Sequence, residues 1–236
     1  GRKMSSTAQN LASSRIAALL DENSFVEIGA AVTARATDFN MNNTDTPSDG
    51  VVTGYGVIND SLVYVYSQDA SVLGGSMGEM HAKKITRIYD MAMKMGAPVI
   101  GLIDCAGLRL QEASDALNAF GELYLKQSLA SGVVPQIAVI TGVCAGAAAV
   151  IASMADVTIM TEKAELFLNA PFNTPDGKLE GAGKAANAAK SGVADILAKD
   201  DAEAIAKAKK LAAILPANNI SLACLLYTSP SPRDRG

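Results

Sequence analysis

The chain has 236 residues, of which 49% are hydrophobic and 19% charged, and its formal net charge is −4. This size and composition allow a sizeable core and favour a compact soluble α/β protein over a disordered chain. The small acidic excess leaves no broad basic face for nucleic acid, and no apolar run approaches the roughly 20 residues that span a bilayer. We therefore expect a cytoplasmic protein that neither binds nucleic acid nor inserts into a membrane.

Cysteine and histidine usage narrows the chemistry further. The three cysteines, Cys105, Cys144 and Cys224, lie in distant segments and predict neither a disulfide framework nor a zinc site. His81 is the only histidine, which argues against imidazole metal ligation and against a Ser–His–Asp triad. We expect no bound metal.

The first part of the chain predicts short elements that lead into a hairpin. In order, these are a helix over 15–20, a strand over 25–28, a polar loop over 36–50, and β-rich runs over 51–58 and 62–66. Asn59-Asp60 between the last two runs is a hairpin turn signal.

From residue 74 onward, strands and helices alternate. A Gly-rich turn over 74–78 precedes a helix over 79–95, which Gly96 ends. Apolar strands over 99–103, 137–141 and 157–160 then alternate with helices over 111–131 and 146–154, and a last helix covers 200–215 with Asp200 as its cap. This alternation predicts a sheet covered by helices.

The chain divides into one domain and two flanking segments. We expect an N-terminal extension over 1–14, a single domain over 15–222, and a non-native tail over 224–236. The tail sequence, CLLYTSPSPRDRG, has no periodic element and resembles translated sequencing-adapter readthrough.

Two strand ends lead into turns of small residues, and these turns are the best candidates for a functional site. They lie in PVIGLIDCAGLRLQEA, residues 98–113, and in PQIAVITGVCAGAAAV, within residues 135–160. Small residues let a substrate approach the main chain, and unpaired N–H groups at a helix start attract negative charge. Ligands also bind beyond the carboxyl ends of strands in open sheets.

These turns predict an oxyanion site made of backbone amides. The expected donors are the N–H groups of Gly107, Leu108, Gly146 and Ala147. We expect Ala106 and Ala145 to clear space for the ligand, with Gly74 and Gly75 lining the same pocket. An ordinary close packing of helix on strand is the alternative explanation for the small residues.

Other polar residues carry weaker signals. Ser76 and His81 are five apart with no evident orienting acid, so a serine hydrolase is disfavoured, and we expect His81 to be a surface or helix-packing residue. Arg109 and Glu112 have the i, i+3 spacing of a solvated pair. The remaining expectations are a solvated basic helix face at Lys83, Lys84 and Arg87, and an apolar filler at Cys144.

At these motifs the chain resembles the carboxyltransferase subunits of biotin-dependent acyl-CoA carboxylases and decarboxylases. The matching strings include DGVVTGYG, VYSQDASVLGGSMGEMHAKKI, GLIDCAGLRLQEA and SGVVPQIAVITGVCAGAAA, and the match covers residues 15–219. The resemblance implies an α/β, crotonase-like (Clp/crotonase) ββα superhelix, here as a single domain that is the first of two related domains.

The resemblance also implies the reaction and its partners. The family moves CO2 between carboxybiotin, held by a biotin carboxyl carrier protein, and the α-carbon of an acyl-CoA, with the thioester enolate held by backbone amides. A second carboxyltransferase domain and a homo-oligomer complete each active site. The family usually has DSGGAR where this chain has DCAGLR, and Gly-Gly where it has Gly146-Ala147, which leaves the acyl group open.

Two alternatives stay open at this point. A crotonase-type enoyl-CoA hydratase or isomerase would need a carboxylate over the substrate, and Glu112 or Glu122 is the nearest candidate. A catalytically incomplete CoA-ester-binding subunit would bind acyl-CoA without turnover. A Clp-type peptidase is disfavoured because its Ser and His are missing from the expected turns.

Overall fold

The computed structural model describes residues 10–35, 39, 41–170 and 181–221. The expected non-native tail, Cys224 and the first nine residues of the expected N-terminal extension lie outside the described residues.

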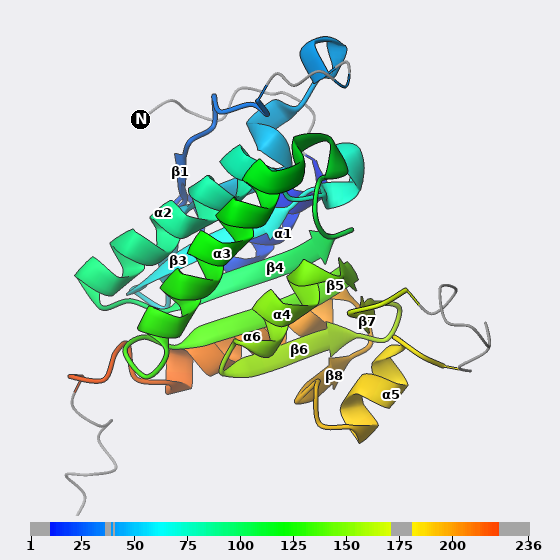
Figure 1. The fold of residues 1–236 in the computed structure, drawn as a ribbon. Coiled ribbons are helices and arrows are strands. Elements are labelled where there is room, and N and C mark those ends of the chain that lie inside the picture. The colour runs from blue at the N-terminus through cyan, green and yellow to red at the C-terminus, as the bar shows by residue number, and fades with distance from the viewer. Residues whose placement is uncertain (1–9, 36–38, 40, 171–180, 222–236) are drawn as a thin grey trace, which may run out of the picture.

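One sheet organises the described part of the chain (Figure 1). Its order is β1-β2-β3-β4-β5-β6-β8, and β7 pairs with β5. The first three strands are antiparallel, and all the pairings from β3 onward are parallel. The strands are β1 (Val26–Ile28), β2 (Val51–Ile58), β3 (Ser61–Gln68), β4 (Val99–Cys105), β5 (Gln136–Ala145), β6 (Val157–Thr161), β7 (Glu165–Phe167) and β8 (Ile196–Ala198).

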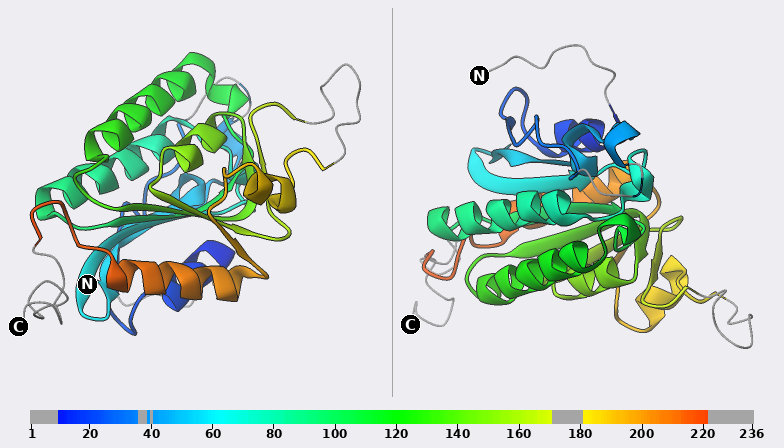
Figure 2. Two further views of the ribbon diagram at one scale, coloured as in Figure 1. Left: turned by 90° about the horizontal axis from the view of Figure 1, so that it is seen from below. Right: turned by 45° about the horizontal axis from the view of Figure 1, so that its top comes forward.

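Helices cover both faces of the sheet (Figure 2). On one side lie α2 (Glu79–Met95), α3 (Ala113–Ala130) and α4 (Ala147–Ser153), and on the other lie α1 (Leu11–Leu19) and α6 (Asp201–Ile214). Two apolar clusters fill the spaces between these layers, one against each face. The short α5 (Ala185–Lys190) packs beside β7 and β8. The apolar parallel strands are thus buried on both faces, as their continuous hydrophobic runs predict.

The hairpin and the long helix α2 confirm the sequence-based predictions. Asn59 and Asp60 both have positive φ, 49° and 63°, as a two-residue hairpin turn requires. Helix α2 spans Glu79–Met95, and Gly96 ends it in the left-handed conformation with φ 64° and ψ 45°.

Strand β5 is longer than predicted. It was expected to end at Thr141, but it continues to Ala145, so residues 142–145 are strand and not turn. The Asp104 carboxylate supports this extension, since its Oδ1 accepts the N–H of Val143 at 3.2 Å. Helix α3 starts later than predicted because a 3-10 turn, Leu110–Glu112, precedes it.

Candidate functional site

The two small-residue turns lie side by side at the carboxyl edge of β4 and β5. Cys105 and Cys144 are register partners at the ends of these strands. A Cβ atom on Gly107 would lie only 3.0 Å from the carbonyl oxygen of Ala145. We call residues 105–109 the first turn and residues 145–147 the second turn. Their contact places backbone N–H groups from both turns at one edge of the sheet.

In the second turn, the two predicted donors differ. Gly146, with φ 57° and ψ −125°, already donates its N–H to the carbonyl of Phe167 at 2.9 Å, so this amide is not free in the structure. Ala147 is the first residue of α4, and its N–H finds no acceptor among the described residues. Tyr124 fixes the same residue by donating to the Ala147 carbonyl at 2.8 Å.

In the first turn, Leu108 has the free amide. The N–H of Ala106 donates to Gly74 O at 3.1 Å, and that of Gly107 points to the Cys105 thiol at 3.4 Å, a weak acceptor. Within the part of the chain that the structure describes, no acceptor takes the N–H of Leu108. Both Leu108 and Ala147 are half-buried residues.

The Gly-rich segment over 74–78, called here the glycine turn, packs against the first turn. The N–H of Met77 donates to Gly107 O at 2.8 Å, and the N–H of Arg109 donates to Met77 O at 3.0 Å. A Cβ on Gly75 would lie 2.1 Å from the carbonyl oxygen of Asp104, so only glycine allows this approach. The glycine turn therefore supports the first turn.

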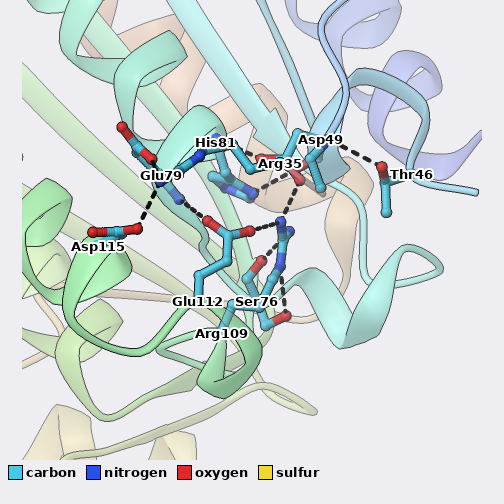
Figure 3. A network of polar contacts seen from close by, with 10 residues as sticks. Arg35, Thr46, Asp49, Ser76, Glu79, His81, Arg109, Glu112 and Asp115 are labelled. Carbon is cyan, nitrogen blue, oxygen red and sulfur yellow. Dashed lines mark hydrogen bonds and ion pairs between the residues drawn. The ribbon is translucent and has the colours of Figure 1, made fainter. Parts of the chain in front are cut away.

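A buried ion cluster, formed by Arg109, Asp49 and Glu112, lies behind the first turn (Figure 3). Arg109 Nη1 contacts Asp49 Oδ1 and lies 2.9 Å from Glu112 Oε1, and Nη2 donates to Ser76 O at 2.7 Å. Arg109 has 0% exposure and Glu112 has 4%. The prediction of a solvated Arg109–Glu112 pair is therefore wrong, because both side chains pack inside the fold at the start of α2.

The same two carboxylates cap the N-terminus of α2. The N-cap residue Gly78 has no side chain, and Glu112 Oε2 instead accepts the N–H of Glu79 at 2.6 Å. Asp49 Oδ2 accepts the N–H of His81 at 2.7 Å. Carboxylates at a helix N-terminus are favoured by the unpaired N–H groups and the helix dipole.

Glu112 has both oxygens engaged, which argues against its use as the base of a hydratase. Oε1 faces the Arg109 guanidinium, and Oε2 faces the start of α2. The other hydratase candidate, Glu122, lies exposed on α3. Neither carboxylate occupies the first or second turn.

His81 is fully buried on α2, so of the two expected positions it has the helix-packing one and not the surface one. Its Nδ1 lies 2.9 Å from the carbonyl oxygen of Asp49 and its Nε2 lies 3.1 Å from Gln68 Nε2, so Nδ1 donates and Nε2 accepts. Burial, and then the positive charge of Arg109, lower the pKa of His81 well below its usual value. The Ser76 hydroxyl faces Arg109 Nε at 3.4 Å, so no Ser–His pair forms.

Lys84 departs from the predicted solvated face. Lys83 and Arg87 are exposed as predicted, but Lys84 is buried and its Nζ donates to the carbonyls of Ser48, at 2.8 Å, and Val51. Burial lowers the pKa of Lys84 to about 8.

Asp49 is the member of the buried ion cluster that the sequence analysis did not single out. It lies in a turn in which Ser48, Asp49 and Gly50 have φ of 53°, 49° and 72° in succession. Left-handed conformations cost non-glycine residues about 1–2 kcal/mol each, so contacts elsewhere must hold this turn. The Asp-Gly pair before a β-rich run is a turn signal in the sequence, but it does not reveal the partner of Asp49.

Two cavities lie near the sheet, and Leu108 and Ala147 line neither of them. One, of about 220 Å³, lies between the start of α1 and the ends of β3 and β4. The other, of about 250 Å³, lies between β7 and α5. Across the described residues, no group of three or more His, Cys, Asp and Glu side chains could hold a metal ion. None of the helices described is long and apolar enough to cross a membrane.

The order of strands and helices defines an α/β protein of the crotonase-like, carboxyltransferase type. The chain belongs to the carboxyl transferase domain family, whose model matches residues 4–235. The family resemblance read from the sequence is thereby confirmed.

Individual relatives agree with this assignment. The chain is 46% identical to a propionyl-CoA carboxylase beta chain of Roseobacter denitrificans, over 87% of this chain and 42% of that one. It is 42% identical to the methylmalonyl-CoA decarboxylase subunit alpha of Propionigenium modestum, over 94% of this chain and 44% of that one. A crystal structure of transcarboxylase 12S superposes with a TM-score of 0.86 at 39% identity, covering 90% of this chain and 43% of that one. The chain thus spans less than half the length of these relatives.

Proposed function

We propose that the chain forms the acyl-CoA-binding half of a biotin-dependent acyl-CoA carboxyltransferase. One observation carries the proposal: two adjacent turns at one sheet edge present the free N–H groups of Leu108 and Ala147. Gly107, whose N–H has only a thiol acceptor, would add a third donor. Gly146 would contribute only if its bond to Phe167 O were exchanged.

The proposed chemistry needs no acid or base from these turns. When the α-carbon of an acyl-CoA exchanges CO2, negative charge develops on the thioester oxygen as an enolate. Backbone donors aimed at that oxygen stabilise the charge, and each is typically worth about 100–1,000-fold in rate. Carboxybiotin supplies the CO2 and its ring nitrogen can carry the proton. The chain's own part is to bind the thioester, orient its carbonyl and donate hydrogen bonds.

The partners follow from the missing length and from an exposed helix face. Relatives of this chain are more than twice as long, so we propose that a second carboxyltransferase domain, a biotin carboxyl carrier protein and a homo-oligomer complete the site. The transcarboxylase 12S structure is described as a hexamer assembly with methylmalonyl-CoA bound. Exposed leucines beside the first turn and along α3 offer an apolar surface to such a domain: Leu110, Leu117, Leu125 and Leu129.

An Ala147→Pro variant tests the donor role. Proline removes the N–H but is well tolerated at the first position of a helix, where Ala147 lies. In the chain assembled with a second domain and carrier, we expect carboxyl transfer from methylmalonyl-CoA to fall about 100–1,000-fold. Ala147→Ser, which keeps the N–H while adding similar bulk, is the matched control and should lose far less.

Several outcomes would contradict the proposal. Unchanged turnover in Ala147→Pro would remove the oxyanion role of this amide. Robust transfer to free biotin by the isolated chain would show that no second domain is needed. Hydration of an enoyl-CoA would favour the hydratase, whereas binding without turnover in the complete assembly would favour a CoA-ester-binding subunit.

A further inference from the structure

We infer that the buried ion cluster is a positioning device that directs the N–H of Leu108 into the oxyanion site. The inference rests on the proposed function and names the residues that set the geometry of one donor. Arg109 is its centre, and Asp49 and Glu112 hold Arg109 in place. None of the three would touch the substrate.

The orientation of the Leu108 amide follows from its neighbours. Gly107 O accepts from Met77 N, and Arg109 N donates to Met77 O, which forms a short parallel bridge between Met77 and Leu108. In such a bridge the flanking groups point toward the partner, so the N–H of the central residue points away from it. The Met77 bridge therefore turns the Leu108 N–H away from the glycine turn.

The Arg109 side chain fixes the bridge from the other side. Its Nη2 donates to Ser76 O at 2.7 Å, and its Nε faces Ser76 Oγ at 3.4 Å, directly before Met77. Arg109 thus holds the glycine turn by its main chain at Met77 and by its side chain at Ser76. A planar guanidinium can reach several acceptors in fixed directions at once, which a lysine ammonium cannot reproduce.

The two carboxylates connect Arg109 to helix α2. Asp49 and Glu112 bind Arg109 and also accept the first N–H groups of α2, a helix of 17 residues (Figure 3). Burial raises the pKa of Asp49 more than the Arg109 charge lowers it, as expected where two carboxylates share one guanidinium in a dry site. His81 and Gln68 extend the network to the end of β4, since Gln68 Oε1 accepts the N–H of Asp104 at 3.2 Å.

A purely stabilising role explains this arrangement less well. Apolar residues of similar volume can often replace a buried ion cluster without loss of stability, because desolvating the charges offsets their attraction. Each hydrogen bond of the cluster, however, fixes a direction. Here the hydrogen bonds fix the two residues that flank Leu108. Gly107 is held by its bond to Met77, and Arg109 is itself a member of the cluster.

Binding of matched ligands by this chain separates positioning from folding. The probes are propionyl-CoA and S-propyl-CoA, a thioether that keeps the length of the acyl group but has no carbonyl oxygen. Isothermal titration calorimetry gives the ratio of their dissociation constants. A general folding defect weakens both ligands alike, whereas a misdirected Leu108 amide reduces only the thioester preference. One backbone hydrogen bond corresponds to roughly a 3- to 10-fold preference.

We expect Arg109→Lys to lower that preference by roughly 3- to 10-fold, the contribution of one backbone hydrogen bond, while it binds the thioether as the unaltered chain does. Asp49→Asn, which keeps the size and shape of the side chain, serves as a second variant if Arg109→Lys does not fold, and should reduce the preference in the same way. Ile205→Ala, in the apolar cluster on the other face of the sheet, is the control that should destabilise the fold and retain the preference.

The binding ratios of the variants decide between these roles. A wild-type preference that survives in Arg109→Lys, or in Asp49→Asn if Arg109→Lys does not fold, overturns the positioning role and leaves the proposed function intact. Loss of the thioester preference in Ile205→Ala as well would show that any destabilisation of the fold removes the preference, and would also overturn the positioning role. No preference in the unaltered chain overturns the proposed recognition of the thioester by amides, and the inference falls with it.

Discussion

Replacing Gly78 by alanine should break the buried ion cluster without straining the backbone. Gly78 has φ −96°, which alanine adopts freely, so the expected loss comes from the added methyl group alone. That Cβ would lie 2.2 Å from Glu112 Oε1 and 2.6 Å from Arg109 Nη1. Both distances are far below van der Waals contact, so the Arg109–Glu112 pair must separate or shift.

The size of the effect distinguishes this mechanism from a simple helix-cap change. Alanine at an N-cap costs about 1 kcal/mol or less relative to glycine. Breaking a buried ion pair so that one charge loses its partner costs about 3–5 kcal/mol. We therefore expect Gly78→Ala to lower the free energy of unfolding by about 3 kcal/mol or more. The chain has no tryptophan, so urea unfolding followed by far-UV circular dichroism is the suitable measurement.

Gly121→Ala is the matched control. Gly121 lies inside α3, where a Cβ would meet nothing within 4 Å. The same substitution there should stabilise the chain by about 0.8–1 kcal/mol through helix propensity. A loss of less than about 1 kcal/mol in Gly78→Ala would show that the ion cluster is free to shift and cannot fix the position of its neighbours.

Two further predictions concern pH and helix capping. The folded state holds His81 neutral with a lowered pKa, whereas the unfolded chain takes up a proton near pH 6.5; stability should therefore decrease as pH falls below 6.5, with a slope approaching about 1.4 kcal/mol per pH unit. Urea unfolding between pH 7 and 5.5 checks this, and because His81 is the only histidine, an unchanged slope in His81→Gln would contradict it. Asp200 Oδ1 accepts the N–H of Glu203 at 2.9 Å at the start of α6, so Asp200→Ala should cost about 1 kcal/mol in the same assay. Asp200→Ser should cost much less, and equal losses in both variants would show that this cap is not responsible.

Local signals made much of the fold predictable. The ends of α2 follow from Gly78 and Gly96, and the β2–β3 hairpin follows from Asn59-Asp60, because the residues that decide these features are neighbours in sequence. The extension of β5 could not be predicted in the same way. It depends on the carboxylate of Asp104, which lies on the adjacent strand 39 residues earlier than Val143.

The candidate site likewise has features that nearby residues determine and features that depend on residues distant in sequence. Small residues identify both turns, so their backbone amides are readable from the sequence. The sequence does not show which of these amides are free. The N–H of Gly146, for example, donates a hydrogen bond to Phe167 on β7, a strand without a clear sequence signal. The burial of Arg109 was missed for a related reason: its partner Asp49 lies 60 residues away in a loop.

If the backbone amides act as proposed, the groups that stabilise charge are separate from the side chains that shape the space for the substrate. The side chains of Ala106, Leu108 and Ala147 can change in size without deleting a single N–H, so such changes would reshape the space for the acyl group and leave the hydrogen-bond donors in place. Gly107 and Gly146 are the exceptions, because their φ of 103° and 57° disfavours any side chain. Substrate range could therefore drift at three positions of the two turns while two glycines keep the backbone path constant.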